Sequence, residues 1–335
     1  MKALILSGGQ GSRLTPFTLT TPKPLLSILN IPLIVYQIQL LKYYNIKEIG
    51  LGLSYKSDKF KKILGNNKKY GIKIHYLIEK TPMGTGGAIK YAEQFLNGDY
   101  FFVFNGDILT DINLSEMLKF HIEKKAFVTI ACVKVKEPYN YGVILTDKNS
   151  RIKKFVEKPE NFISDIINAG IYILNSKILD EFPDKKNISI EREIFPLLIK
   201  KGIPVFAYIY DGYWIDAGTC EKFLQATDDI IQKKYKIDFL NEKDIMLGEK
   251  NLIYGKNVKI PKDLKIKGWA VVGNKSIIKE SVTIEKSIIF SDVHIGKGVY
   301  ISDSIIGNNV YIGDNSVIEN SYIGDKSFIS DFSKI

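Results

Sequence analysis

The sequence predicts an α/β fold in which a doubly wound, mixed sheet is followed by a C-terminal parallel β-helix. Short apolar runs alternate with amphipathic stretches over the first two thirds of the chain, as strands and helices do in such sheets. Turns rich in glycine and other small residues follow two of these runs. In the last quarter, aliphatic residues recur at steps of five and six, which indicates an internal repeat.

The first element is an unbroken apolar strand at residues 3–6, a pattern that fits a central parallel strand buried on both faces. It ends at the turn 7–11, Ser-Gly-Gly-Gln-Gly, where the glycines remove Cβ atoms that would keep an anion away from the backbone N–H groups. Arg13 then offers a planar fork of donors, and Lys23 offers a mobile point charge. Strand, turn and cations together predict a phosphate-binding site.

The next elements alternate in type. Strands are predicted at 48–54, 72–78 and 100–104, and helices at 33–44, 57–64 and after the small-residue turn 79–88. Ligands in such sheets bind outside the carboxyl ends of the strands. The glycine turn, the turn 79–88 and Asp107 each follow a predicted strand. We therefore expect them to line one crevice.

The string G-G-x-G-x-R-L-x-P-x-T-x-x-x-P-K-P at 8–24 lacks the lysine of a P-loop and the third glycine of the dinucleotide-binding fingerprint. It resembles the signature of the sugar-phosphate nucleotidyltransferases, or nucleoside-diphosphate-sugar pyrophosphorylases. The resemblance implies a Rossmann-like catalytic domain that transfers a nucleotidyl group from an NTP to a hexose 1-phosphate and releases pyrophosphate. It implies that Arg13 holds the pyrophosphate, Lys23 the α-phosphate, and Asp107 the metal. The nucleotide-binding residues that it implies are Leu6, Gly8, Gly9, Gly11, Ser12, Arg13, Lys23, Glu79, Gly84 and Asp107.

The same resemblance implies a Mg²⁺ site. An aspartate after a strand is often only a helix N-cap, but Asp107 stands where the family has its metal-binding carboxylate. Magnesium takes one or two carboxylates together with substrate phosphate oxygens. The family has a second aspartate in a W-x-D-x-G context, which corresponds here to Asp216.

Three turns between these aspartates resemble the sugar-binding half of the family. They are Y-G-V at 141–143, the E-K-P that ends a strand at 157–159, and N-A-G at 168–170. Alone, each reads as a surface turn. The resemblance implies that the hexose 1-phosphate is bound by Gly142, Glu157, Lys158 and Asn168.

The substrate pair is indicated by a second resemblance. The segment 187–196, N-I-S-I-E-R-E-I-F-P, which opens a helix at Ser189, resembles the guanylyltransferases that act on mannose 1-phosphate, as do residues 18–24. This implies GTP and mannose 1-phosphate. Thr15 stands where these enzymes often have arginine, so a uridylyl-, thymidylyl- or adenylyltransferase acting on glucose 1-phosphate stays open.

A helix predicted at 221–236 closes the catalytic domain, 1–236, and a connector is predicted at 237–250. Residues 251–335 then carry the repeat, because Ser287, Ser304 and Ser321 stand 17 apart in similar contexts. It resembles the left-handed parallel β-helix of hexapeptide-repeat proteins. The open end of such a solenoid leaves strand edges uncovered, so we expect a homo-oligomer, with the β-helix as the candidate surface.

Length, charge and composition limit the class of protein. The 335 residues favour two domains. The net charge of +10 comes mostly from dispersed lysine, with only three arginines, which argues against nucleic-acid binding. No apolar run is long enough to span a membrane, the N-terminus leaves no room for a signal peptide, and two cysteines without a pairing pattern favour the cytoplasm.

Two other classes of function compete with the transferase. A non-catalytic subunit that binds a nucleotide sugar predicts lost cations or carboxylates, yet Arg13, Lys23, Asp107 and Asp216 are present. An acyltransferase acting through the β-helix needs a histidine base and a long loop; His294 is the only histidine there, and no insertion interrupts the repeat. Nucleotidyl transfer needs no general base, because the attacking phosphate oxygen is already an anion.

Overall fold

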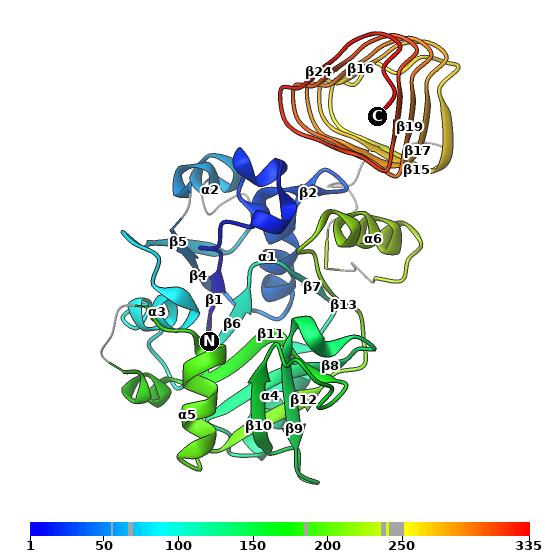
Figure 1. Ribbon diagram of the computed structural model, residues 1–335. Helices are drawn as coiled ribbons and strands as arrows, with labels where there is room; N and C mark the ends of the chain where they lie inside the picture. The colour runs from blue at the N-terminus through cyan, green and yellow to red at the C-terminus, as the bar shows by residue number, and fades with distance from the viewer. Residues whose placement is uncertain (55, 66–69, 184–186, 236–238, 241–250) are drawn as a thin grey trace. The chain divides into compact units, whose positions relative to one another are not determined.

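The computed structural model describes residues 1–335 except 55, 66–69, 184–186, 236–238 and 241–250 (Figure 1). The chain forms two compact units that interleave along the sequence. Unit 1 contains residues 1–9 and 37–214, and unit 2 contains residues 10–36 and 215–335. The segment that carries Arg13 and Lys23 therefore belongs to the same unit as the C-terminal repeat.

Unit 1 is built on a nine-stranded mixed sheet, as predicted. Its main path runs β10-β9-β11-β6-β1-β4-β5, with β8 paired to β11 and β12 paired to β8. The pairs of β1 with β4 and β6, of β4 with β5, and of β12 with β8 are parallel, whereas β11 runs antiparallel to β6, β8 and β9. The strands are β1 (Lys2–Leu6), β4 (Glu48–Leu53), β5 (Lys73–Ile78), β6 (Tyr100–Asn105), β8 (Val128–Lys134), β9 (Gly142–Thr146), β10 (Ile152–Glu157), β11 (Ile166–Asn175) and β12 (Val205–Ile209), with a short β7 (Ile108–Thr110) after β6.

Helices cover both faces of this sheet. Successive side chains of β8 point to opposite faces of the sheet. Val128 and Ile130 join the core that includes α3 and α5, whereas Thr129 contacts α4 on the other face. That core also contains Leu4 of β1 and Phe195 of α5. The helices are α1 (Leu33–Tyr43, which crosses into unit 2), α2 (Ser57–Leu64), α3 (Gly84–Tyr91), α4 (Leu114–Glu123) and α5 (Phe195–Lys200).

A buried histidine joins α4 to the sheet. His121 is fully buried, its Nδ1 lies 2.8 Å from Thr129 Oγ1, and its Nε2 has no hydrogen-bond partner among the described residues. Burial disfavours the imidazolium and lowers the pKa of His121 from 6.5 to about 4. The neutral ring is therefore the form that the fold accommodates.

This histidine makes the stability of the protein depend on pH. Between pH 6.5 and about 4 the unfolded chain binds more protons than the folded one, so stability rises with pH in this window. We expect His121 to contribute a loss of about 3 kcal/mol in the free energy of unfolding on acidification through the window. Urea unfolding of wild type and His121→Phe across the window measures it. In His121→Phe the free energy of unfolding should lose this part of its dependence on pH, whereas the control His75→Gln should keep it. Parallel curves of the free energy of unfolding against pH for wild type and His121→Phe would contradict the prediction.

Unit 2 contains the repeat, and the described strands of the repeat pair in parallel, as a β-helix requires (Figure 1). Ile284 pairs with Ile301 and Ile301 with Ile318, which confirms the 17-residue period as one full coil. The strands are β14 (Leu252–Tyr254), β15 (Lys265–Val272), β16 (Ile277–Ile278), β17 (Thr283–Ile289), β18 (His294–Ile295), β19 (Tyr300–Ser302), β20 (Ile305–Ile306), β21 (Tyr311–Ile312), β22 (Val317–Glu319), β23 (Tyr322–Ile323) and β24 (Phe328–Ile329). Their inward aliphatic side chains form one core.

The remainder of unit 2 is the segment 10–36 and helix α6. Segment 10–36 contains three single 3₁₀ turns, η1 (Ser12–Leu14), η2 (Phe17–Leu19) and η3 (Lys23–Leu25), and the hairpin β2 (Ser27–Ile28) and β3 (Ile31–Pro32). β13 (Trp214–Asp216) leads from unit 1 into α6 (Cys220–Ile231). Trp269 of the β-helix is buried and donates to Asp228 of α6 over 2.9 Å.

Two predicted helices differ in detail from the structure. The helix predicted at 221–236 ends at Ile231, because Lys233 adopts a left-handed conformation with φ of 59° and the N–H of Lys234 turns back to the carbonyl of Asp229. The helix predicted to open at Ser189 begins with the π-helical turn η6 (Ile190–Ile194), which Ser189 caps, and only then continues as α5. Of the predicted connector 237–250, all but residues 239 and 240 lie outside the described residues.

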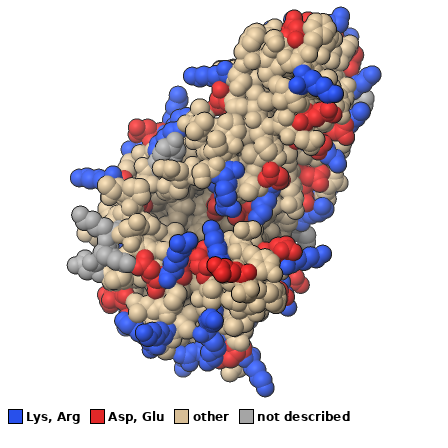
Figure 2. Space-filling view, viewed as in Figure 1, with Lys and Arg blue, Asp and Glu red and all other residues tan. Residues whose placement is uncertain are grey.

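No helix in the described part of the chain is long and apolar enough to cross a membrane. On the face drawn in Figure 2, lysine and arginine side chains are interspersed with acidic ones.

Candidate active site

In unit 1, the turns that follow the parallel strands lie together at one edge of the sheet. The N–H of Ser7 donates to Gly52 at the end of β4, and the N–H of Gly106 after β6 donates to Leu6, both over 2.9 Å. Ser54 Oγ donates to the carbonyl of Gly8 over 2.6 Å. The glycine turn and the turn that carries Asp107 are thus neighbours, because parallel strands end at the same edge.

Within the glycine turn, Gly9 faces open space. A Cβ added to Gly9 would have no atom within 4 Å, so packing inside the protein does not require a glycine here. A bare backbone facing an open edge suits the close approach of a ligand. This is the geometry expected of a phosphate-binding turn.

The turn after β6 is braced by a residue that sequence reasoning missed. Gln37 of α1 is buried, and its Nε2 donates to the carbonyls of Asn105 and Ile108 over 2.7 and 2.9 Å. These two bonds fix the backbone on both sides of Asp107. A lone glutamine in an apolar helix gives no local signal of this role.

Buried oxygen atoms without partners surround the same turn. Ser7 Oγ, Gln37 Oε1 and Asn105 Oδ1 are buried and have no hydrogen-bond partner among the described residues. Such atoms need a donor, a water or a cation. Hydroxyl, amide and carboxylate oxygens are suitable ligands for a hard divalent cation. The residues around Asp107 therefore fit a Mg²⁺ ion chemically.

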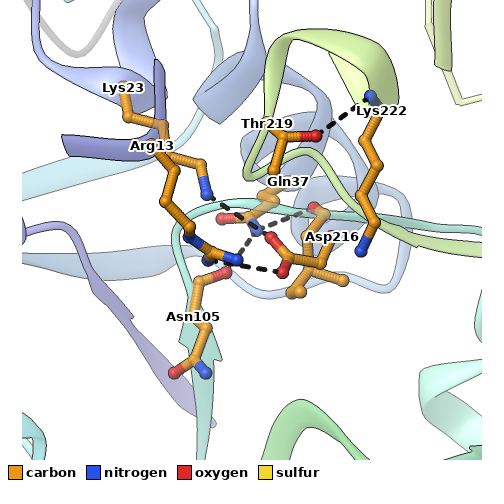
Figure 3. Close-up of polar contacts among 8 residues, drawn as sticks. Arg13, Lys23, Gln37, Asn105, Asp216, Thr219 and Lys222 are labelled. Atoms are coloured by element: carbon orange, nitrogen blue, oxygen red, sulfur yellow. Dashed lines mark hydrogen bonds and ion pairs between the residues drawn. The ribbon is translucent and has the colours of Figure 1, made fainter. Parts of the chain in front are cut away.

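In unit 2, two cations converge on one carboxylate. Lys23 Nζ lies 3.4 Å from Asp216 Oδ1, and Arg13 Nη2 lies 3.7 Å from Asp216 Oδ2 (Figure 3). The Lys23 side chain is only 8% exposed, whereas that of Arg13 is 60% exposed. Removing either partner of the buried ammonium–carboxylate pair would leave an uncompensated buried charge, and the exposed guanidinium of Arg13 is accessible to a ligand.

Segment 10–36 places both cations by folding on itself. Thr18 Oγ1 donates to the carbonyl of Gly11 over 3.0 Å. Gly11 has φ of 66°, and a Cβ at this position would lie 3.0 Å from Cβ of Lys23. The glycine therefore allows the Lys23 stem to lie against the turn that leads to Arg13.

The residues predicted to bind the hexose lie on three neighbouring strands of unit 1. Glu157 of β10 pairs with Gly142 of β9, and Val143 of β9 pairs with Ile167 of β11, the residue before Asn168. A Cβ on Gly142 would lie 2.5 Å from Cζ of Phe155 and 2.9 Å from Glu157 Oε2, so the glycine makes room for the ring and for this carboxylate. The structure therefore brings Gly142, Glu157 and Asn168 together, with Lys158 exposed directly after β10.

Glu191 and Arg192, which the sequence analysis did not assign to the hexose site, add charge to this area. Burial, followed by the nearby carboxylate of Glu191, raises the pKa of Glu157, while Lys158 and Arg192 oppose the rise. Glu191 is held by the hydroxyls of Thr85 and Ser189, at 2.7 and 3.0 Å from its Oε2. Two carboxylates and two cations make a polar, charged area suited to hydroxyl groups and a phosphate.

Asn168 is oriented by its own strand. Its side-chain nitrogen donates to Tyr172 Oη over 2.8 Å, and its oxygen accepts the N–H of Gly170 over 2.9 Å. Tyr172 is buried, and burial raises its pKa, so its hydroxyl stays protonated. The sequence does not reveal Tyr172 because it reads as one apolar residue of a buried strand.

The segment 79–88 is held from both ends, and the helix expected after it begins inside it, because α3 starts at Gly84. Glu79 is buried, its Oε2 accepts the N–H of Met83 over 3.0 Å, and burial raises its pKa. Gly84 opens α3 with φ of 71°. A Cβ there would lie 2.8 Å from Asn187 Oδ1 and closer still to the carbonyl of Ile188. Gly84 is thus required both by its conformation and by the segment packed on it.

Gly84→Ala is expected to lower the thermal midpoint and to weaken NTP binding, because the methyl group would displace the segment around Ile188 or the turn. A non-glycine residue in the left-handed region costs roughly 1 to 2 kcal/mol before any clash. Gly202→Ala is the matched control, because Gly202 has the same φ of 71° but no atom within 4 Å of an added Cβ. Calorimetry and NTP titration of both variants measure the difference; equal effects in the two would contradict the requirement for space at Gly84.

All three histidines have structural neighbours. His75 lies 2.9 Å from Glu48, His121 is buried against Thr129, and His294 stacks on Tyr311 with ring centroids 5.0 Å apart. None of them belongs to the two clusters described above. The chemistry available there is charge stabilisation and positioning by cations, carboxylates and backbone N–H groups.

Comparison with known proteins agrees with the fold. Residues 2–233 match the family model described as nucleotidyl transferase, and residues 249–334 match the model described as GMPPB C-terminal domain. The chain belongs to the nucleotidyl transferase family.

Among its relatives are a mannose-1-phosphate guanyltransferase of Yarrowia lipolytica, 42% identical over 68% of this chain and 63% of the relative, and one of Aspergillus oryzae, 38% identical over 79% and 73%. A mannose-1-phosphate guanylyltransferase of Mycobacterium tuberculosis is 36% identical over 69% of this chain and 64% of its own length. The chain thus spans slightly less than two thirds of the length of two of these relatives.

A solved structure, HddC from Yersinia pseudotuberculosis complexed with GMP-PN, is also similar. It superposes with a TM-score of 0.60 at 29% identity and covers 68% of this chain and 99% of that one.

Proposed function

We propose that this protein transfers a nucleotidyl group from an NTP to a hexose 1-phosphate and releases pyrophosphate. The observation that carries the proposal is the pair of cations, Lys23 buried and Arg13 exposed, held on Asp216 directly after the glycine turn. Membership of the nucleotidyl transferase family supports it. Neutralising several phosphate charges is the main task of such a site, and these residues are suited to it.

The substrates that we propose are GTP and mannose 1-phosphate. Three relatives, which align with 68% to 79% of this chain, are named mannose-1-phosphate guanylyl- or guanyltransferases. The similar structure of HddC was solved with GMP-PN. Gly142, Glu157, Lys158 and Asn168 are assigned to the hexose 1-phosphate, and the turns at Gly8–Gly11 and Glu79–Gly84 to the nucleotide.

In the proposed reaction an oxygen of the hexose phosphate attacks the α-phosphorus of the NTP in line, and the bond to the leaving pyrophosphate breaks. The nucleophile is already ionised, so no side chain has to remove a proton. Lys23 neutralises charge on the α-phosphate as it becomes five-coordinate, and Arg13 binds the leaving pyrophosphate. Glu157 and Asn168 hold the hexose hydroxyls so that its phosphate approaches from the side opposite the leaving group.

A divalent metal ion is generally used by this family, and we propose Mg²⁺ held by Asp107 and Asp216. When bound, such an ion neutralises phosphate oxygens and orients the triphosphate. Asp107 is braced for this task by Gln37, and Asp216 carries two cations that limit its negative charge before substrate binds.

The reaction is tested by pyrophosphate release in a grid of GTP, ATP, UTP and dTTP against the 1-phosphates of mannose, glucose and N-acetylglucosamine, each with Mg²⁺. We expect one strong response, with GTP and mannose 1-phosphate. A response for another pair would replace the substrates but keep the reaction. No response in any cell of the grid would overturn the proposal and favour a non-catalytic subunit that binds a nucleotide sugar.

We also propose a homo-oligomer formed through the β-helix, and a cytoplasmic location. At the C-terminal end of the β-helix, Phe328 and Phe332 are 73% and 76% exposed and Ile335 is 48% exposed, an apolar end that another copy would cover. Both cysteines are unpaired and buried, as suits a reducing compartment. Light scattering at micromolar concentration should give a multiple of the chain's 38.0 kDa mass; the monomer mass would contradict self-association.

A further inference from the structure

The loop that carries the two cations rests on a corner of the β-helix. We define the docking corner as Val272, Phe290, Gly324 and Asp325, and the cation loop as residues 11–26. Thr20 of the cation loop donates to Asp325 Oδ2 over 2.6 Å. Asn30, a few residues further on, donates to the carbonyl of Val272 over 3.0 Å. All these residues belong to unit 2.

An aromatic pair forms the centre of this contact. The rings of Phe17 and Phe290 meet edge to face at 86°, with centroids 5.6 Å apart. Phe17 is 1% and Phe290 7% exposed, so the pair is fully packed. Edge-to-face aromatic pairs stabilise more than their buried area alone implies.

Phe290 stands out from the repeat to which it belongs. The register of the coils aligns Tyr254, Val272, Ile289, Ile306 and Ile323, so the residue after each of them occupies one equivalent column. Four of the five residues in this column are glycines, and the fifth is Phe290. A Cβ on Gly273 or Gly307 would lie 2.5 and 2.6 Å from backbone atoms of the next coil, as close packing of the coils requires. The one large side chain in the column is the one that contacts the cation loop.

Asp325 likewise does more than its equivalents. In the neighbouring column, Asn274, Asn308 and Asp325 each accept, through Oδ1, a backbone N–H of the preceding coil, at 2.7, 3.1 and 2.7 Å. This bond holds the coils together and needs only one side-chain oxygen. Asp325 has a second oxygen, and that oxygen binds Thr20.

The two residues of the cation loop that contact the docking corner lie between the two cations in the sequence. Arg13 and Lys23 flank Phe17 and Thr20, and each cation is three or four residues from one of these contacts. The segment is short, contains no helix longer than a single 3₁₀ turn, and has little means of holding its shape alone. A displacement of about 1 Å at a catalytic group costs roughly 10²-fold in rate.

We propose that the docking corner of the β-helix positions Arg13 and Lys23, so that the β-helix is a working part of the catalytic apparatus. Phe290 and Asp325 are positioning residues: they touch the cation loop and act through it. The inference rests on the proposed function, because its kinetic consequences presuppose nucleotidyl transfer. It assigns the β-helix a role in the reaction in addition to self-association.

The test uses the full chain and two matched pairs of variants. Phe290→Ala is compared with Ile312→Ala, which removes a fully buried side chain from another sheet of the same β-helix. Asp325→Ala is compared with Asp331→Ala, because Asp331 also accepts a backbone N–H of the preceding coil, that of Asp314 over 2.9 Å. Each control removes a contact within the β-helix and leaves the side chains that contact the cation loop in place.

Two measurements are made on each variant. Hydrogen exchange of peptides covering residues 11–26 reports the order of the cation loop without requiring activity. Steady-state kinetics reports kcat/KM for the NTP and KM for the hexose 1-phosphate. We expect Phe290→Ala and Asp325→Ala to exchange faster in residues 11–26 and to lose roughly ten- to a hundredfold in kcat/KM for the NTP, with the hexose 1-phosphate KM unchanged. Phe290→Tyr should restore both, because it keeps the ring.

The inference is overturned if each variant behaves like its control. It is also overturned if a variant loses catalytic efficiency with both the NTP and the hexose 1-phosphate and loses protection from exchange throughout the β-helix, because that pattern indicates a merely structural effect. An inactive wild type would overturn the proposed function but not the exchange result. An active wild type whose Phe290→Ala variant has unchanged exchange and NTP kinetics would overturn the inference alone.

Discussion

Replacing Lys23 with methionine is expected to lower kcat roughly 10²- to 10³-fold, the loss typical for removal of one preorganised group that stabilises transition-state charge. The ammonium is buried, so its charge acts in a medium that screens it less than water does. Methionine has a similar length and leaves the packing against Gly11 largely in place. Charge on the α-phosphate grows as the new bond forms, so kcat should fall more than the affinity for NTP.

The control is Lys153→Met. Lys153 also pairs with an aspartate, Asp147, at 3.1 Å, but its side chain is 57% exposed. An exposed pair of this kind contributes little, so the control should keep the activity and stability of wild type. Pyrophosphate release under saturating substrates measures both variants. Activity of Lys23→Met within threefold of the wild type would remove Lys23 from the phosphate site.

The buried position of Lys23 was not evident from the sequence, although its chemistry was. A lysine between two prolines reads as a turn residue, and burial depends on contacts with Gly11 and Asp216. By contrast, the rule that ligands bind at the carboxyl ends of parallel strands correctly predicted that the glycine turn and the turn of Asp107 would be neighbours.

Periodicity predicted the β-helix in greatest detail, because each coil repeats the same contacts and the repeat is written in the sequence itself. The contacts of the docking corner break the repeat and join positions far apart, such as Thr20 and Asp325, which are 305 residues apart. No local pattern encodes such a contact. The only sign of the contact in the sequence is that Phe290 replaces a glycine in the column of glycines, and this sign can be interpreted only when the register of the coils is known.

The residues missed in unit 1 share one property: each acts through tertiary contacts rather than through its type. Gln37 braces Asp107 with two bonds to backbone carbonyls, and Glu191 influences Glu157 from a different segment. Their neighbours in sequence are apolar or form part of a helix start. Sequence reasoning finds motifs that touch ligands directly more readily than residues that support them.

Asp216→Asn is expected to lower turnover by two orders of magnitude or more and to raise the Mg²⁺ concentration needed for half-maximal rate, because a neutral amide is a poorer ligand for a hard cation than a carboxylate. The carboxylate also pairs with Lys23 and Arg13, so the loss of rate alone does not identify its role. The dependence on Mg²⁺ does. A metal ligand changes the half-saturating Mg²⁺ concentration, whereas a partner that only orients the cations changes the KM for NTP at an unchanged dependence on the metal.

Asp107→Asn should show the same shift in Mg²⁺ dependence, because Asp107 is the other proposed ligand. Asp147→Asn is the control, since it alters an exposed aspartate–lysine pair and keeps the oxygen that accepts backbone N–H groups. Rates are measured over a titration of Mg²⁺ at saturating NTP for all three variants. If Asp216→Asn kept the wild-type Mg²⁺ dependence while Asp107→Asn lost it, Asp216 would be assigned to holding Arg13 and Lys23 in place, and the metal to Asp107 with the phosphates of the substrate.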